Sequence, residues 1–319
     1  MRARIRWLTI LAAAALLPCL ADRPARAERP AGPSGTVQGM AYGPFREGQS
    51  PEWGIYPTLD DVRDDMPLLA LVGNGVRSYG CQDLETIVTA SEEVGLPLAL
   101  GAWLSGVADA DRAEIECAVA QALASPNVAT VVVGSESVLR GNLSPSEVCA
   151  YLEEVRGRTG RPVTTAEPWH VWVSNPDLAA CADFLLVHIH PYWECQPIDG
   201  AVDYVQEKHG VVAAQFPGRR VVIGETGWPS EGMGREGVCG PMPEPTAEEQ
   251  RQFAEAFLAW ARPAGVEYYF FDAFDEPWKC ESGRPEVECH WGIFDTNRAS
   301  KPARGAFVPY RVWVPGVMR

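Results

Sequence analysis

The sequence predicts one α/β domain folded as a (β/α)8 TIM barrel. Eight short apolar runs alternate with helix-like segments along the chain, which is the order that a closed parallel sheet with helical crossovers requires. Polar and aromatic residues follow nearly every run, as they do at the mouth of a barrel. No Gly-x-Gly-x-x-Gly turn follows the first run, which disfavours a doubly wound sheet that binds a dinucleotide.

The expected strands are rich in aliphatic and β-branched residues and are bounded by glycine, proline or polar residues. They cover residues 36–42, 75–79, 96–103, 128–134, 162–166, 184–188, 220–224 and 266–271. Two of the intervening helices carry start signals. Ser144 precedes Pro145 at the first helical position, and Thr246 precedes a helix over residues 247–261.

The first 27 residues have the pattern of a secretory signal peptide. Arginines at positions 2, 4 and 6 precede an apolar run over residues 7–20, and Ala-Arg-Ala at 25–27 is a small-x-small cleavage site. The run is shorter than the roughly 20 residues that span a bilayer, which favours a cleaved leader over a membrane anchor. We therefore expect residues 28–319 to be a secreted, extracellular or periplasmic domain without membrane attachment.

Charge and cysteine content narrow the functional class. Removing residues 1–27 takes away five arginines and one aspartate, so the formal net charge moves from −15 to −19. Such an acidic chain is a poor partner for nucleic acid or anionic lipid and suits a neutral substrate. Eight of the nine cysteines remain, an even number that allows four disulfides in an oxidising compartment, and none shows Cys-x-x-Cys spacing.

Two glutamates each follow a β-branched run. Glu136 follows the fourth expected strand, and Glu225 follows the seventh within the segment Gly-Glu-Thr-Gly-Trp-Pro at 224–229. Residues at these strand ends can point inward and meet over the barrel axis. A pair of carboxylates is the usual machinery for breaking a glycosidic bond, and a separation of about 5 to 5.5 Å leads to retention of configuration. Taken alone, Glu136 could equally be a solvated surface group.

The chain resembles glycoside hydrolase family 17, the β-1,3-glucanase and β-1,3-glucanosyltransferase family. The resemblance runs from residue 39 to residue 294, and its most specific motifs are residues 224–229, Phe-Asp-Glu-Pro-Trp-Lys at 274–279 and Trp-Gly-Ile-Phe at 291–294. It implies Glu225 as nucleophile and Glu136 as acid/base. Residues 164–169 and 190–193 look like the bacterial branch of that family.

One residue departs from the family pattern. The position before the acid is usually asparagine, which hydrogen-bonds the sugar 2-hydroxyl, and here it is Ser135. A serine hydroxyl is shorter than the amide, so the contact would need a bridging water. We expect weaker catalysis or a shifted sugar preference, whereas the Val-Gly before and the Leu-Arg-Gly after Glu136 keep the family frame.

Aromatic side chains near the strand ends could stack on pyranose rings, although some of them would serve packing alone. The resemblance also implies Glu276, Lys279 and Glu288 as supporting charged residues. Arg77 and Lys279 would balance the acidic cluster and hold Glu225 ionised. The expected substrate-binding residues are Tyr42, Arg77, Tyr79, Ser135, Glu167, Trp169, Tyr192, Trp193, Trp228, Glu276, Trp278, Lys279 and Glu288.

His188 and His190, two residues apart at the end of the sixth expected strand, have the spacing of a pair of metal ligands. Only three other histidines occur in the chain, so we expect neither a metal nor a cofactor, with His188 packed at the strand end and His190 lining the cleft. Cys280 and Cys289 bracket the segment between Lys279 and Glu288 and are expected to pair. A Cys195–Cys239 pair is the second expectation.

Three functional hypotheses follow. The first is a monomeric, retaining hydrolase of β-1,3-linked glucan, and the second is a glucanosyltransferase that uses the same two glutamates. The third is a polysaccharide-binding barrel in which Ser135 has silenced the chemistry. Turnover and product length distinguish them.

Overall fold

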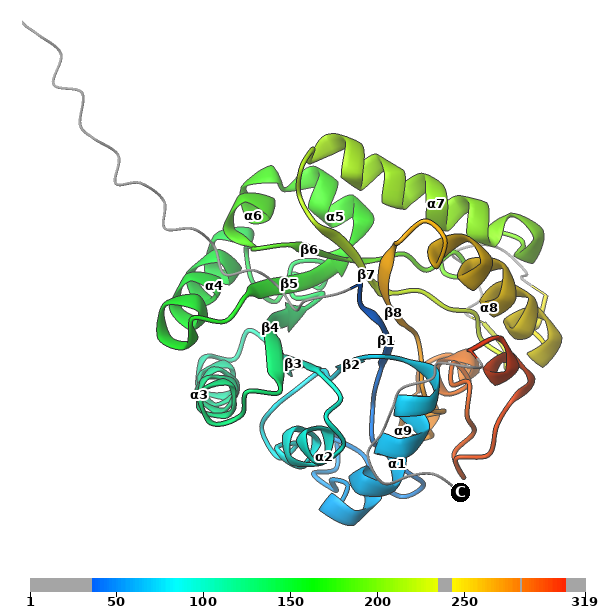
Figure 1. Cartoon of the computed structure of the whole chain (residues 1–319), viewed down its shortest axis with the longest axis horizontal. Coiled ribbons are helices and arrows are strands. Elements are labelled where there is room, and N and C mark those ends of the chain that lie inside the picture. Colours follow the sequence, from blue (N-terminus) through cyan, green and yellow to red (C-terminus); the bar gives the residue numbers. More distant parts are fainter. Residues whose placement is uncertain (1–35, 235–242, 282, 308–319) are drawn as a thin grey trace, which may run out of the picture.

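The computed structural model describes residues 36–234, 243–281 and 283–307. Eight parallel strands close into a barrel in chain order, with β1 paired to both β2 and β8 (Figure 1). The strands are β1 (Gln38–Ala41), β2 (Val76–Arg77), β3 (Leu98–Ala102), β4 (Val128–Ser135), β5 (Val163–Pro168), β6 (Leu185–His188), β7 (Val221–Glu225) and β8 (Glu267–Phe270). The predicted barrel and its eight strands are confirmed.

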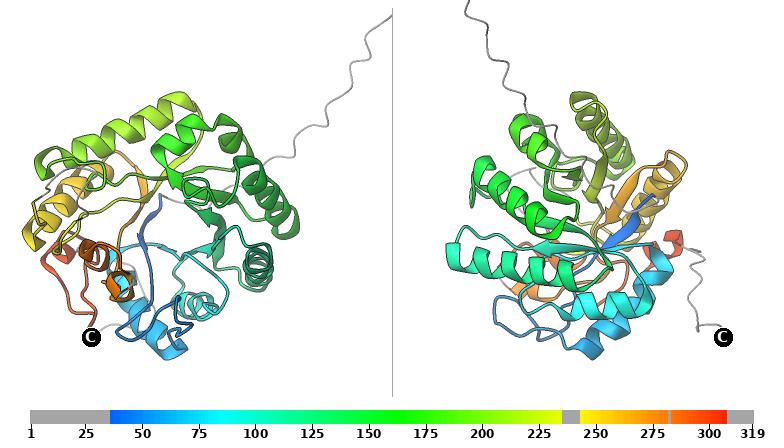
Figure 2. Two further views of the ribbon diagram at one scale, coloured as in Figure 1. Left: turned by 180° about the vertical axis from the view of Figure 1, so that it is seen from behind. Right: turned by 60° about the vertical axis from the view of Figure 1, so that its left-hand side comes forward.

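Helices surround the barrel on its outer side, as Figure 1 and the two views of Figure 2 show. The crossovers contain α1 (Leu59–Val72), α2 (Thr86–Val94), α3 (Ala108–Ala124), α4 (Pro145–Thr159), α5 (Trp169–Ser174), α6 (Pro176–Cys181), α7 (Ile198–Gln215) and α8 (Ala247–Ala261). After β8 come α9 (Trp278–Glu281), η1 (Glu286–Cys289) and η2 (Pro302–Phe307), and η2 packs against α8.

Three of the helices begin at a capping box. Thr58, Ser144 and Thr246 each accept a hydrogen bond from the backbone N–H three residues later, and the acidic side chain at that position binds the backbone N–H of the cap. Each box satisfies amides that have no partner within the helix. The start signals predicted at Ser144 and Thr246 are confirmed.

The strands bury both faces. Val131 and Val133 belong to the large apolar cluster between strands and helices, whereas Val132 belongs to a smaller cluster with Ala99 and Leu186 inside the barrel. Successive side chains of a strand point to opposite faces, which explains this division. The barrel interior is therefore packed, and an open site forms only where the strands end.

Three disulfides lie in the described part of the chain, and they support an oxidising compartment. They join Cys81 to Cys117, Cys149 to Cys181, and Cys280 to Cys289. The predicted Cys280–Cys289 pair is confirmed, and it ties α9 to η1.

The expected signal peptide at residues 1–27 and the expected partner Cys239 lie outside the described residues and stay predictions. Among the described residues, no helix combines the length and the apolar character that crossing a membrane requires.

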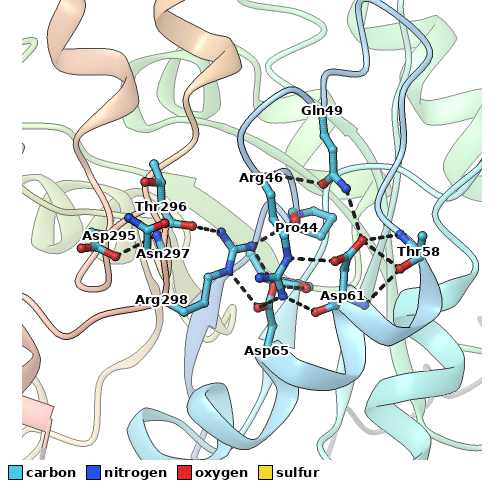
Figure 3. A network of polar contacts seen from close by, with 11 residues as sticks. Pro44, Arg46, Gln49, Thr58, Asp61, Asp65, Asp295, Thr296, Asn297 and Arg298 are labelled. Carbon is cyan, nitrogen blue, oxygen red and sulfur yellow. Dashed lines mark hydrogen bonds and ion pairs between the residues drawn. The ribbon is translucent and has the colours of Figure 1, made fainter.

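A buried carboxylate joins the loop after β1, helix α1 and the loop after β8. Asp65 of α1 is fully buried and accepts hydrogen bonds from the Tyr42 hydroxyl at 2.9 Å, from Arg46 at 2.8 Å, and from Arg298 through two nitrogens at 2.9 Å each. Figure 3 shows Asp65 between the two guanidinium groups. This network anchors Tyr42, a predicted site residue, from behind.

We expect Asp65→Asn to lower the free energy of unfolding by about 3–5 kcal/mol, because the substitution leaves two partly buried arginines facing a neutral group. Urea unfolding followed by circular dichroism measures the change. Glu93→Gln is the matched control. It breaks an exposed ion pair with Arg63, which belongs to the same helix as Asp65, and should barely change the urea concentration at the unfolding midpoint. Equal losses in the two variants would contradict the prediction.

Candidate active site

Two glutamates from different strands face one imidazole. Glu136 directly follows β4, and Glu225 is the last residue of β7. His188 at the end of β6 has its Nδ1 2.8 Å from Glu136 Oε1 and its Nε2 3.3 Å from Glu225 Oε1. The carboxyl groups thus converge on the two edges of the same ring, within the mouth of the barrel.

Arg77 of β2 crosses the barrel interior to reach the same place. Its side chain is fully buried, and Nη1 donates to Glu225 Oε1 at 2.7 Å and to the Gly224 carbonyl at 3.0 Å. Nη2 donates to the Ser135 hydroxyl at 3.0 Å. One guanidinium therefore links β2, β4 and β7, and its charge lies against Glu225, as the sequence analysis expected.

The two glutamates differ in environment. His190 Nε2 lies 3.0 Å from Glu225 Oε2, so both oxygens of Glu225 are engaged. Burial alone would raise the pKa of Glu225, but the charges of His188, Arg77 and His190 outweigh it and hold the pKa well below the usual range. Burial acts on the pKa of Glu136 in the same direction, and the His188 hydrogen bond outweighs it there too. The Glu225 charge opposes this lowering.

A cleft of about 1130 Å³ opens above these residues. Eleven of the predicted site residues line it: Tyr42, Tyr79, Ser135, Glu136, Tyr192, Trp193, Glu225, Glu276, Trp278, Lys279 and Glu288. Trp103 also lines the cleft and is 40% exposed, with the Arg140 guanidinium 4.4 Å from the centre of its ring. Exposed aromatic faces beside charged groups suit a carbohydrate.

The segment after β8 contributes a second charged cluster. Lys279 forms an ion pair with Glu276, and its Nζ lies 3.9 Å from Asp272 Oδ2. The Trp278 ring nitrogen donates to Glu276 Oε1 at 3.0 Å. Burial raises the pKa of Asp272 well above its usual range and also raises that of Glu288, although Lys279 opposes both shifts. The Cys280–Cys289 disulfide closes the loop that carries these groups.

Four predicted substrate-binding residues do not line the cleft. Glu167 is fully buried and accepts hydrogen bonds from the backbone of the turn after β4. Trp228 is 3% exposed, and its ring packs against Tyr192 and Phe253. The structure thus places both side chains in packing or supporting positions away from the cleft surface.

Trp169 is the third of these residues. Its ring nitrogen donates to the carboxylate of Glu194, and the Lys208 ammonium lies 4.7 Å from the centre of its ring. These partners draw the indole toward α7 instead of into the cleft. Arg77 is the fourth of these residues. It lies behind the cleft surface and contacts Glu225, Ser135 and the ring of Tyr79 there.

The sequence predicted only a packing role for His188. His188 does pack at the strand end, being 1% exposed, yet it contacts both glutamates. The signal was present in the sequence, since histidine closes an otherwise apolar strand and a second histidine follows two residues later. His190 lines the cleft, as the sequence analysis expected.

Within residues 36–234, 243–281 and 283–307, two groups of side chains have spacings that a metal ion could use. Ligand atoms of His188, His190 and Glu225 lie within 4.8 Å of one another. The Arg77 guanidinium bonds the same carboxylate, however, and its positive charge opposes a cation there. The other group contains Cys280 and Cys289, whose sulfurs are joined in a disulfide and are not thiolate ligands.

A closed (β/α)8 barrel with glutamates at the ends of strands four and seven over one aromatic cleft defines a glycoside hydrolase type of protein. The family comparison agrees. The chain belongs to the BtgE/BtgC glycoside hydrolase domain family, whose model matches residues 39–292.

Individual relatives carry glucanase names. The chain is 27% identical to a probable glucan endo-1,3-β-glucosidase, btgC, of Aspergillus clavatus over 82% of this chain and 42% of that protein. It is 29% identical to a glucan 1,3-β-glucosidase of Arthroderma benhamiae over 76% of this chain and 83% of that protein. The chain thus spans less than half the length of the first curated relatives. These relatives are fungal, so the expected bacterial branch is not supported.

Solved structures show the same likeness. A family 17 β-1,3-glucanosyltransferase from Rhizomucor miehei superposes with a TM-score of 0.70 and 28% identity, covering 83% of this chain and 95% of that chain. An active-site mutant of that enzyme, 27% identical with the same TM-score and the same coverage of both chains, was solved in complex with laminaritriose.

We expect Arg77→Gln to raise the pKa of Glu225 toward the ordinary glutamate value of about 4.3, because a buried positive charge 2.7 Å away is removed. A carbon-13 NMR titration of glutamate-labelled protein follows the carboxyl directly. Arg220→Gln is the control, since it breaks the pair with Glu267 at the opposite end of β7. An unchanged Glu225 titration in Arg77→Gln would refute the assignment.

Proposed function

We propose that this protein is a retaining glycosidase of β-1,3-linked glucan, with Glu225 as nucleophile and Glu136 as acid/base. The observation that carries the proposal is the shared imidazole of His188, which contacts both carboxyl groups in one cleft. Two carboxylates that flank one bond are what glycoside hydrolysis needs. The names of the fungal relatives and the laminaritriose complex of a similar enzyme support β-1,3-glucan as the substrate class.

In the first step a Glu225 oxygen attacks the anomeric carbon as the glycosidic C–O bond breaks. Glu136 gives its proton to the leaving oxygen, which departs as a sugar hydroxyl. Arg77 and His190 hold the Glu225 carboxylate ionised and oriented before attack. The negative charge of Glu225 disappears when the glycosyl ester forms.

In the second step Glu136 takes a proton from water, whose oxygen attacks the same carbon and displaces Glu225. The Glu225 charge raises the pKa of Glu136 in the free protein, and this effect is absent in the ester. Glu136 is therefore more easily ionised when it must act as a base. The His188 hydrogen bond lowers the pKa of Glu136 in the free protein, so the acid step requires this bond to relax when sugar enters.

Transfer to a second sugar is the alternative outcome of the same intermediate. The likeness to the Rhizomucor miehei glucanosyltransferase favours it, because that enzyme covers most of this chain at 28% identity. A sugar hydroxyl would then replace water in the second step, and Glu136 would take its proton in the same way.

Ser135 enters this proposal as a second partner of Arg77. Its hydroxyl accepts a hydrogen bond from Arg77 Nη2, and Ser135 also lines the cleft. Ser135 therefore lies between the cation that pairs with Glu225 and the space where sugar would bind. A silenced, purely binding barrel would not need Glu225 held ionised by three basic groups. The variants Glu225→Gln and Glu136→Gln test that alternative directly.

We also propose a location for the protein, based on the sequence outside the active site. Residues 1–27 would direct export, and residues 28–319 would act as a secreted, monomeric catalytic domain whose acidic surface avoids nucleic acid and anionic membranes. The three described disulfides support an oxidising environment outside the cytoplasm.

We expect Glu225→Gln to abolish hydrolysis of laminari-oligosaccharides and Glu136→Gln to slow it by about 10²–10⁴-fold, since one removes the nucleophile and the other the proton donor. Chromatography measures turnover, and proton NMR of the first product gives its anomeric configuration. Retained β configuration is expected. Preserved binding with equal, negligible turnover in wild type and both variants would favour the binding barrel instead.

Product length separates hydrolysis from transfer. If water is the main acceptor, laminaripentaose should yield only shorter chains, whereas a transferase should also yield chains longer than five sugars at high substrate concentration. Mass spectrometry of the early products measures the ratio. The same digestion on β-1,4- and β-1,6-linked glucans should leave them intact, and cleavage of either would contradict the proposed linkage.

A further inference from the structure

The backbone of Glu136 has an unusual conformation. Its φ is +56°, and Gly134 two residues earlier has a φ of +81°. A left-handed conformation is unfavourable for a residue with a Cβ atom, so surrounding contacts must maintain it. The position of this carboxyl group therefore depends on whatever fixes the turn after β4.

That turn covers residues 137–141 and is closed by backbone hydrogen bonds without forming a helix. The amide of Arg140 donates to the Glu136 carbonyl at 2.9 Å, and the amide of Gly141 donates to the Val138 carbonyl at 3.0 Å. The first amides of such a turn find no acceptor within it. Two of them, on Val138 and Leu139, point to a side chain from the neighbouring strand.

Glu167 of β5 supplies the missing acceptors. Its Oε1 accepts from the Val138 amide at 2.8 Å, and its Oε2 accepts from the Leu139 amide at 3.2 Å. The carboxyl group is fully buried and does not line the cleft. Burial raises the pKa of Glu167 to about 7 against the lowering effect of these two bonds.

Neighbouring residues of β5 hold the same turn. The amide of Glu136 donates to the Ala166 carbonyl at 2.7 Å, and the Thr165 hydroxyl donates to the Gly134 carbonyl at 3.1 Å. Three consecutive residues of β5 thus contact the backbone on both sides of Glu136. Glu167 is the member of this group that caps the turn through its side chain.

We propose that Glu167 is a positioning residue that fixes the acid/base Glu136 by capping its turn from β5. The proposal rests on the proposed function, because it concerns the acid of that mechanism. Glu167 touches no reacting atom; it acts through the backbone of Val138 and Leu139, which sets where the Glu136 carboxyl group lies.

A misplaced acid slows only those reactions that need proton donation. A departing sugar is strongly basic and requires the proton, whereas dinitrophenolate leaves without it. Loss of the cap should therefore slow natural oligosaccharides while sparing an activated aryl glycoside. A residue with a merely structural role would change both substrates alike.

The test compares kcat/KM of wild type and Glu167→Gln on laminaritetraose and on 2,4-dinitrophenyl β-laminaribioside. We expect about a 10- to 100-fold loss on the first substrate and less than about a threefold loss on the second. Glu136→Gln should show the same selective pattern. Equal losses on the two substrates would overturn the proposal.

Glu267 offers a matched control. Its carboxyl group also accepts a backbone hydrogen bond, from the Val37 amide at 3.1 Å, and it begins β8, at the end of the barrel opposite to the Glu136 turn. Glu267→Gln should leave the ratio of the two kcat/KM values unchanged. A selective loss in this variant as well would overturn the special role of Glu167.

Glu167→Asp keeps the test decisive if the glutamine variant does not fold. The shorter side chain retains the carboxyl group but cannot reach both amides, so the selective loss should persist. A wild-type ratio in this variant would overturn the capping role. Failure of wild type to cleave either substrate would refute the proposed function itself, and so the two failures are distinguishable.

Discussion

The buried contact between Arg77 and Glu225 is the interaction on which the site depends. A guanidinium placed inside the barrel must be compensated, and Glu225 at 2.7 Å provides the opposite charge. Nη1 also donates to the Gly224 carbonyl, and Nη2 donates to the Ser135 hydroxyl. Because Arg77 belongs to β2 and its partners belong to β4 and β7, one side chain fixes the mouth of the barrel from within.

The asymmetry between the two glutamates follows from this arrangement. The Glu225 side chain is 8% exposed and binds Arg77 and His190, whereas that of Glu136 is 28% exposed and binds only His188 among the described side chains. The more enclosed group remains ionised because basic groups surround it. The more open group can exchange its proton with solvent, which is the property that an acid/base residue needs.

The strands and the two glutamates could be predicted from the sequence because their signals are local. Apolar runs bounded by turn residues mark the strands, and in a parallel barrel their ends share one mouth. The role of His188 was less visible, because the β6–β7 register skips Gly224 and pairs His188 with Glu225. The sequence period does not reveal which residue of a neighbouring strand a side chain meets.

The predicted site residues that do not line the cleft show a second limit of the sequence, since packing partners decide where a side chain points. Trp228 follows the nucleophile closely, yet its indole stacks on Phe253 of α8. Glu167 stands beside a strand end like the two site glutamates, yet backbone amides of a neighbouring loop capture it. Both outcomes depend on which partner the fold brings near, which is tertiary information. Aromatic and acidic residues at strand ends are therefore candidates for the cleft and for its supports alike.

The site glutamate and the supporting glutamates respond to pH in opposite directions. Glu225 has a lowered pKa, so its contribution to stability is present above about 4.3 and is lost as the pH falls. Glu114 of α3 and Glu167 of β5 accept backbone hydrogen bonds, and burial raises the pKa of each to about 7. Their contribution to stability is therefore present below about 4.3 and is lost as the pH rises through about 7. The ionised nucleophile limits the stable pH range from below, and the burial of Glu114 and Glu167 limits it from above.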